Sequence, residues 1–208
     1  MTGYLISILI PTLIERRGVF NKMIDKLYQQ IEAGNYQKKI EIVSICDDRS
    51  VKLCDKRNTL QKLSRGKYFL HLDDDDELDD SFCKYVIEHI ELDLPVYQPN
   101  RDPDIIGFNQ LARVSGNRFV VIPHIQSDFN LNPAPDKEGY PAYYRFPWQY
   151  CLWNEKYKKI YRTDVDTNAR EDQNWLKKVL LEYPKNMTYI DKILHYYNYD
   201  DPSKTTCQ

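Results

Sequence analysis

The sequence predicts an α/β fold with a mostly parallel sheet flanked by helices. Apolar runs that suit buried strands alternate with stretches of helical periodicity through residues 4–90. This alternation is typical of parallel sheets, in which helices connect the strands and cover both faces. Acidic side chains follow directly after the second and third predicted strands, at the edge where such sheets bind ligands. The sequence therefore predicts both the fold class and the edge that carries a site.

The strands and helices of the first half each have a separate signal. Residues 4–10 form a continuous apolar run, YLISILI, that ends at Pro11, and further strands are predicted at 40–46 and 67–72. Three helices are predicted between and after these strands from apolar side chains at helical spacing. Their apolar positions are Phe20, Met23, Ile24, Leu27 and Ile31 in the first, Leu53, Leu60 and Leu63 in the second, and Phe82, Tyr85, Val86 and Ile90 in the third.

The second half of the chain is less regular. Strands are predicted at 105–111 and 119–122, a helix at 171–181 and a last strand at 187–197. Residues 126–147 are rich in proline, asparagine and aromatic side chains, and we expect a long loop there. A chain of 208 residues is long enough for one substantial domain at roughly 150 residues per domain, and we expect a single domain over 1–208.

Composition narrows the class of protein. Hydrophobic residues make up 42% and charged residues 29%, which is ordinary for a globular chain. The net charge of -2 does not suggest the basic surface of a dedicated nucleic-acid binder. No apolar run reaches the 18 or more residues that a membrane helix needs, so we expect no transmembrane segment and a cytoplasmic location.

Four consecutive aspartates, Asp73 to Asp76, follow the third predicted strand. Neighbouring carboxylates repel one another and raise one another's pKa, so a compensating positive charge is expected. Mg²⁺ or Mn²⁺ would supply it, because hard divalent cations prefer carboxylate oxygens and keep positions open for phosphates. An acidic turn that caps the next helix is the simpler reading, and we prefer it for Asp79 and Asp80.

An ordered set of motifs resembles the family-2 glycosyltransferases, which have the Rossmann-like GT-A fold that binds nucleotide-diphospho-sugars. The motifs are ISILIPT at the start, IEIVSICDD at 40–48, KRN at 56–58, GKYFLHLDDDDEL at 66–78 and RED at 170–172. Each motif is weak alone, but their order covers most of the chain. The resemblance implies a nucleotide-sugar-binding half over 1–98 and an acceptor-binding half over 99–208.

The resemblance also implies a role for each matched residue. The donor, most simply a UDP-sugar, would contact Thr12, Glu15, Asp47, Asp48, Arg57, Asn58, Asp73 and Asp74. The metal ion, Mn²⁺ or Mg²⁺, would be held by Asp73, Asp75, Asp76 and His195. The catalytic residues would be Asp172, as the general base, and Glu171 beside it. One departure stands out, because Arg49 occupies the place where the family commonly has glycine.

The helical period gives a separate argument for Asp172. In a helix over 171–181, Asp172 shares a stripe with Trp175, Leu176 and Val179, which predicts that Asp172 faces inward and that Glu171 is turned away. The first turn of a helix also favours an ionised carboxylate. A general base has to be ionised, so Asp172 suits that role, although both acids could simply cap the helix.

The implied reaction is direct displacement at the anomeric carbon of the sugar, with inversion of configuration. A cation would neutralise the leaving nucleoside diphosphate, so a single base suffices. Two alternatives remain open, a nucleotidyltransferase of related fold and a non-catalytic module that binds nucleotide sugars. The acceptor could be a glycan, a protein or a modified nucleobase, and the near-neutral net charge favours a glycan or protein over DNA.

Overall fold

The computed structural model describes residues 3–94, 102–160, 162, 171–182 and 184–199. Within them, ten strands join into one sheet, which confirms the α/β class. The strands are β1 Ile6–Leu13, β2 Ile40–Asp47, β3 Tyr68–His71, β4 Glu77–Leu78, β5 Ile105–Val114, β6 Asn117–Pro123, β7 Asn132–Lys137, β8 Tyr140–Arg145, β9 Leu152–Asn154 and β10 Met187–Asn198. The helices are η1 Ile14–Arg16, α1 Arg17–Ala33, α2 Leu53–Leu63, α3 Phe82–Glu88, η2 His89–Asp93, η3 Glu155–Lys159 and α5 Glu171–Leu181.

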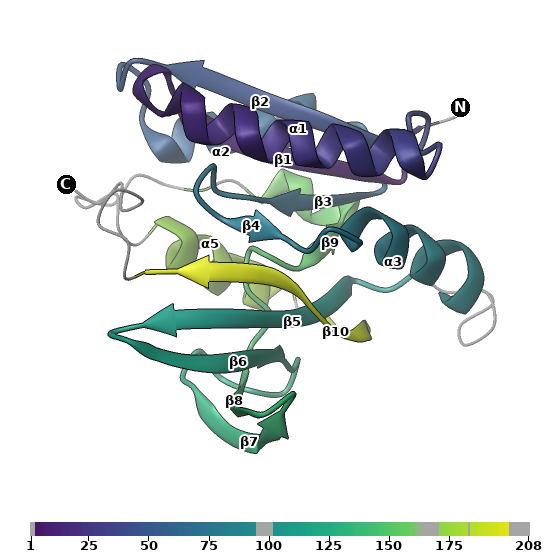
Figure 1. The fold of residues 1–208 in the computed structure, drawn as a ribbon, viewed down its shortest axis with the longest axis vertical. Coiled ribbons are helices and arrows are strands. Elements are labelled where there is room, and N and C mark those ends of the chain that lie inside the picture. The colour runs from purple at the N-terminus through teal and green to yellow at the C-terminus, as the bar shows by residue number, and fades with distance from the viewer. Residues whose placement is uncertain (1–2, 95–101, 161, 163–170, 183, 200–208) are drawn as a thin grey trace.

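The first half forms the parallel part of the sheet. Strand β1 lies between β2 and β3 and is parallel to both, with Ile8 opposite Ile42 on one side and Leu70 on the other. Residues Ile6 to Ile10 of β1 are fully buried, as expected for a strand covered on both faces. Helices α1 and α3 lie in front of the sheet, and α2 and α5 lie behind it (Figure 1).

The second half extends the same sheet. Strand β10 pairs in parallel with β5 and antiparallel with β4, while β9 joins β3 to β5. Beyond β5, strands β6, β8 and β7 follow in that order. The arrowheads of β2, β3, β5 and β10 point toward the same side of the molecule (Figure 1). We call this side the carboxyl rim. The residues that follow the parallel strands lie there.

The expected loop over 126–147 is wrong in its second part, because β7 and β8 form an antiparallel hairpin there. Strand β7 carries two prolines, which removes the sequence signal for a strand. It tolerates them because it lies at the edge of the sheet and has a register irregularity between Ala134 and Lys137. The connecting turn uses Glu138 and Gly139, both with positive φ, as two-residue hairpin turns require.

Two groups of buried side chains make up the core. One lies between the sheet and the helices α1 and α3, and includes Leu27, Phe82 and Phe108. The other lies between the sheet, η3 and α5, and includes Trp153 and Trp175, whose rings meet edge to face at 5.2 Å. The second group packs the first turn of α5 toward the carboxyl rim, and this placement brings α5 into the candidate site.

Candidate active site

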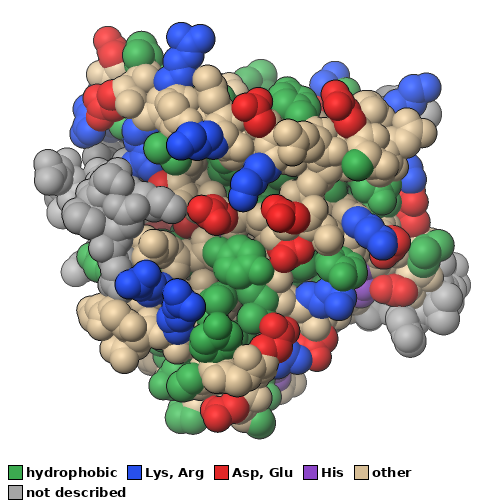
Figure 2. Space-filling view, in the orientation of Figure 1, with side chains coloured by type: hydrophobic (Ala, Val, Ile, Leu, Met, Phe, Trp, Pro, Cys, Tyr) green, Lys and Arg blue, Asp and Glu red, His purple; other side chains and the backbone are tan. Residues whose placement is uncertain are grey.

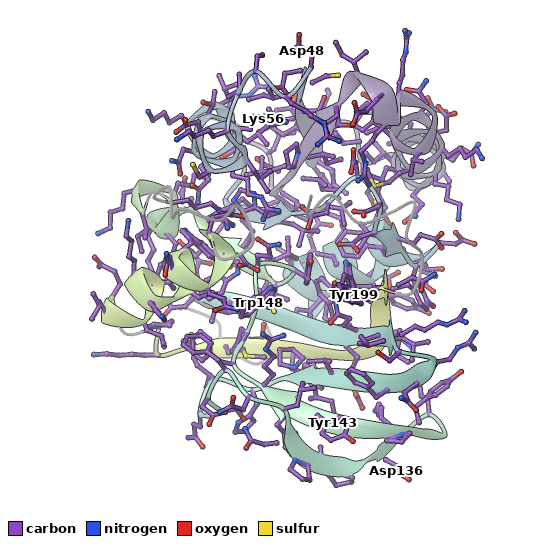
Figure 3. All side chains as sticks on the ribbon, turned by 90° about the vertical axis from the view of Figure 1, so that its left-hand side faces the viewer. Asp48, Lys56, Asp136, Tyr143, Trp148 and Tyr199 are labelled. Carbon is purple, nitrogen blue, oxygen red and sulfur yellow. The ribbon has the colours of Figure 1, made fainter. Side chains whose placement is uncertain are left out.

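The carboxyl rim collects the acidic residues that the sequence singled out. In the parallel register Leu13 is opposite Asp47 and Leu9 is opposite His71, so the ends of β1, β2 and β3 are adjacent. Thr12 at the end of β1 donates a 2.6 Å hydrogen bond from its hydroxyl to Asp74. Figure 3 looks onto this rim, with Asp48 and Lys56 near one end and Trp148 and Tyr199 further along.

Basic side chains of the protein itself partly balance the acidic run. Arg16 at the end of η1 lies 2.9 Å from Asp74 and 3.1 Å from Asp75 through the same guanidinium nitrogen. Burial still raises the pKa of Asp74 to about 6. Burial also raises the pKa of Asp75, and the negative charge of Asp73 raises it further. The acids are therefore held together at a cost in free energy, which a bound cation would reduce.

Asp73 connects the acidic run to α2. Arg57 donates a 2.5 Å hydrogen bond to one oxygen of Asp73, and the Tyr150 hydroxyl lies 3.4 Å from the other. The guanidinium of Arg57 also contacts the side chain of Gln149 and is itself buried. Asp73 retains 29% side-chain exposure, so it can still reach a ligand at the rim.

Asp76, the last of the four aspartates, pairs with His195 of β10. The Asp76 carboxylate lies 3.2 Å from the His195 Nε2 atom, and both side chains are buried. Burial raises the pKa of Asp76 to about 6, although His195 acts in the opposite direction. The Tyr150 ring stacks on the His195 ring at 4.3 Å, and Gln110 lies 2.9 Å from its Nδ1 atom.

The expected metal ligands differ in how well they fit a divalent cation. Within the part of the chain that the structure describes, no three histidine, cysteine, aspartate or glutamate side chains are arranged to hold an ion unaided. Asp73 and Asp75 contact Arg57 and Arg16, but their side chains keep 29% and 19% exposure, so their carboxylates could still reach a hard cation at the rim. Asp76 and His195 are occupied with each other, so they would have to separate to ligate an ion.

The end of β2 is organised around Lys56, whose ammonium group is buried. It forms an ion pair with Asp47 at 2.5 Å and donates to the backbone carbonyl of Thr12 at 3.2 Å. The second Asp47 oxygen accepts a 2.7 Å hydrogen bond from the backbone of Val51. Burial opposes ionisation, but these hydrogen bonds outweigh it and lower the pKa of Asp47. Asp47 is thus a fixed, ionised acceptor at the rim.

Three other expected donor contacts lie at the border of this region. Asp48 is exposed and accepts a 3.3 Å hydrogen bond from the backbone of Ser50. Glu15 is exposed and pairs with Arg49, whose Nε atom lies 3.0 Å from it. Arg49 has a φ of 73°, a left-handed conformation that glycine adopts most readily. Asn58 exchanges two hydrogen bonds with the backbone of Arg162, at 2.9 and 2.7 Å.

The predicted orientation of the two α5 acids is wrong, because Glu171 faces inward and Asp172 is only half-buried. Glu171 lies four residues before Trp175, so the same helical period places it on the buried stripe. It accepts a 2.7 Å hydrogen bond from Arg162 and lies 3.2 Å from the Nε atom of Arg57. These cations outweigh burial and lower the pKa of Glu171.

Asp172 has no comparable partner among the contacts of the described residues. Its Oδ1 atom accepts a 2.7 Å hydrogen bond from the backbone of Gln173. Burial and the charge of Glu171 raise its pKa, while Arg57 and Arg162 act in the opposite direction. Of the two acids, Asp172 is therefore the one whose carboxylate remains available to a proton. Arg170, the first residue of the RED motif, lies outside the described residues.

Sequence reasoning missed five residues that complete the rim: Arg16, Lys56, Gln149, Tyr150 and Arg162. One signal existed for Lys56, because it lies in the KRN motif and on the buried side of α2 with Arg57 and Leu60. The predicted apolar stripe instead included Leu63, which is 55% exposed. The other four contribute through contacts distant in the chain, for which no local signal exists.

The arrangement of strands and helices is similar to that of a protein of known structure. TarS of S. aureus in complex with UDP-GlcNAc matches 96% of this chain with a TM-score of 0.57 and 16% identity. TarS in complex with UDP matches 93% with a TM-score of 0.54 and 16% identity. The chain spans 60% of the length of either structure. No family model and no curated protein matches the sequence.

These findings define the class of the fold. It is the GT-A fold of nucleotide-diphospho-sugar transferases, as the sequence predicts, with the acids 73–76 on its carboxyl rim. In the described residues, no helix is both long enough and apolar enough to cross a membrane. Acidic and basic side chains are interspersed over the face shown in Figure 2, in keeping with the near-neutral net charge.

Proposed function

We propose that the protein is a glycosyltransferase that moves a sugar from a nucleoside-diphosphate donor, a UDP-sugar, onto an acceptor hydroxyl. One observation carries this proposal. Arg57 contacts Asp73 at 2.5 Å and Glu171 at 3.2 Å, so a single side chain links the acidic run to the first turn of α5. Arg57 thereby brings the acids proposed to bind the donor's diphosphate close to Asp172, the acid proposed to accept a proton.

The donor's nucleoside would lie along the ends of β1 and β2. Thr12 and the fixed Asp47 carboxylate offer hydrogen-bond acceptors to the nucleobase. Asp48 and Glu15, both exposed, would border the same space. That TarS was solved with UDP-GlcNAc and with UDP supports a uridine nucleotide as the first donor to test.

The donor's diphosphate would lie against Asp73 and Asp75, where like charges require a cation. These two carboxylates would hold Mn²⁺ or Mg²⁺, with Asp76 and His195 able to join only after their own ion pair opens. Such an ion, when bound, neutralises charge that develops on the leaving diphosphate. Arg57 and Asn58 would then act from α2: Arg57 orients Asp73, and Asn58 fixes the segment at Arg162.

Asp172 would remove the proton from the acceptor hydroxyl. Its half-buried position and raised pKa suit a general base, which works best when its pKa approaches the working pH. Glu171 would position it, because the ion pairs to Arg57 and Arg162 fix the start of α5. With one base and a stabilised leaving group, direct displacement would invert the anomeric carbon. The acceptor would be a glycan or protein rather than DNA, and the location cytoplasmic.

A donor screen tests the proposal. UDP-, GDP- and dTDP-sugars are added with and without Mn²⁺, and the shift in the protein's melting temperature is measured for each. A second assay measures the release of free nucleoside diphosphate from each donor. We expect one nucleotide class to stabilise the protein and to be slowly hydrolysed in the presence of the metal ion. Release of pyrophosphate from a nucleoside triphosphate and a sugar phosphate would instead indicate a nucleotidyltransferase. Donor binding without hydrolysis or transfer would indicate a non-catalytic module.

A further inference from the structure

A cavity of about 560 Å³ lies in the second half of the sheet, and the proposed reaction does not use it. It is bounded by β6, β7, β8 and the beginning of β10, with Ile122, Tyr144, Met187 and Tyr189 among its walls. Its volume is within the range of small-molecule sites, about 300–1,000 Å³. In Figure 3, Asp136 of this region lies at the opposite end of the molecule from Asp48 and Lys56.

We propose that this cavity binds a neutral saccharide unit, separately from the nucleotide donor. The inference rests on the proposed function, since an enzyme that glycosylates a glycan must hold sugar units beyond the one that reacts. The walls offer an aromatic surface to a sugar ring: Tyr144 and His124 lie with ring centroids 5.2 Å apart and at 50° to each other. Flat amphipathic rings of this kind pack against the C–H face of a pyranose.

The lining of the cavity supplies both hydrogen-bond donors and hydrogen-bond acceptors. Lys137 pairs with Asp191 at 2.5 Å, and the Tyr189 hydroxyl, which also contacts the side-chain oxygen of Asn109, lies 3.1 Å from the same carboxylate. These partners lower the pKa of Asp191, so it stays an ionised acceptor. Sugar hydroxyls both donate and accept hydrogen bonds, and an ammonium, a phenol and carboxylates arranged together match that requirement.

The charge of the cavity argues against an anionic ligand. The charges of Lys137 and Asp191 cancel each other, and Asp136, also in the lining, adds a negative charge. A phosphate or a nucleotide would be repelled, whereas an uncharged sugar would not. Asp136 is exposed, so changing it should not disturb the fold.

The cavity and the candidate active site share strand β10. Strand β10 carries Asp191 at the cavity and His195 beside Asp76. They are four positions apart, which is at most about 13 Å along a strand at ~3.3 Å per residue. A glycan of a few units could therefore occupy the cavity with one end while its other end approaches the carboxyl rim.

Saturation-transfer NMR on the full chain tests the proposal. The probes are the neutral trisaccharides maltotriose, cellotriose and chitotriose, each with and without saturating UDP, and a glucuronate-containing trisaccharide as the anionic comparison. We expect at least one neutral probe to bind, with UDP leaving its signal unchanged, and the anionic probe not to bind. Absence of binding by all neutral probes at millimolar concentration, or displacement by UDP, would overturn the inference.

Variants locate the binding. Tyr144→Ala should raise the dissociation constant about tenfold, whereas Tyr28→Ala, at an exposed tyrosine on α1, should leave it unchanged. Asp136→Lys should allow the anionic probe to bind. This second variant still tests the proposal if Tyr144→Ala unfolds the protein. Neutral-probe affinity that is unchanged in Tyr144→Ala, or an anionic probe still excluded by Asp136→Lys, would contradict the assignment. None of these readouts requires donor turnover, so the proposed function can fail or hold independently.

Discussion

Glu171 and Arg162 form a buried ion pair, with 2.7 Å between the carboxylate and the guanidinium. Both side chains are almost fully shielded from water, and Arg57 approaches the same carboxylate from the other side at 3.2 Å. The first turn of α5 is thus fixed to α2 and to the segment at Arg162 by charge rather than by apolar packing alone. Asp172, the next residue, takes its position from this pair.

Replacing Glu171 should damage the fold. Glu171→Gln leaves the buried Arg57 and Arg162 without their shared counter-charge, and breaking a buried pair from one side costs about 3–5 kcal/mol of unfolding free energy. Urea unfolding measures this cost. Glu182→Gln is the matched control directly after the same helix, because Glu182 is about half exposed and 3.5 Å from Lys159. Equal stability of the two variants would contradict the structural role of Glu171.

Replacing Asp172 should spare the fold and reduce transfer. Asp172→Asn keeps the size of the side chain but removes the proton acceptor, so the transfer rate should fall by roughly 10²–10⁴-fold. Donor affinity should change little, because Asp172 is assigned to the acceptor. Single-turnover transfer and donor calorimetry separate the two effects. A variant that transfers sugar at the parent rate would remove Asp172 from the reaction.

Donor binding should depend on a divalent cation and on Asp75. Asp75→Asn removes one of the two carboxylates proposed to hold the ion, and both metal and donor should then bind more weakly, by roughly tenfold or more. Calorimetry in EDTA and in Mn²⁺ measures this dependence. The control is Asp80→Asn, at a side chain that is 88% exposed and lies shortly before α3. Full donor affinity in EDTA would refute the metal requirement.

Asp47 should matter for both stability and donor binding. Asp47→Asn keeps the acceptor toward Val51 but weakens the pair with the buried Lys56, so we expect a loss of about 1–3 kcal/mol in unfolding free energy. The donor's dissociation constant should also rise, while its dependence on Mn²⁺ stays intact. Lys56→Met tests the ion pair from the other side. Unchanged donor affinity in a folded Asp47→Asn variant would show that the donor's nucleobase does not contact Asp47.

Glu41 provides a control at the opposite end of the parallel strands. It accepts hydrogen bonds from Ser7 at 2.7 Å and from the Arg65 backbone at 2.6 Å, and although burial opposes ionisation, these contacts lower its pKa. Its stabilising effect is therefore present above the ordinary glutamate pKa and is lost as the pH falls through the lowered one. Glu41→Gln should cost about 1–3 kcal/mol near pH 7 and less below about pH 4, with donor binding unchanged. A cost independent of pH would contradict this assignment.

Local sequence patterns predicted a helix or strand correctly where one hydrophobic periodicity dominated the segment. The buried run of β1 and the apolar stripe of α1 each identified their element, and the helix 171–181 has the predicted bounds. The hairpin of β7 and β8 was missed, because two prolines and few alternating apolar residues hide an edge strand. Strand pairing across the hairpin, rather than local propensity, stabilises that segment.

The sequence by itself determined the α/β class, the order of the early elements and the carboxyl rim on which Glu15, Asp47, Asp48 and the acids 73–76 lie. These follow from chain order, because each acid comes directly after a strand whose direction the helical crossovers dictate. Only the tertiary structure decided which acids are occupied by partners. Glu171 is bound to Arg57 and Arg162, Asp76 to His195 and Asp47 to Lys56, whereas Asp172 keeps its carboxylate available. These pairs join residues from different elements, and the energy of a charge depends on its burial and neighbours in space, which a one-dimensional pattern does not contain.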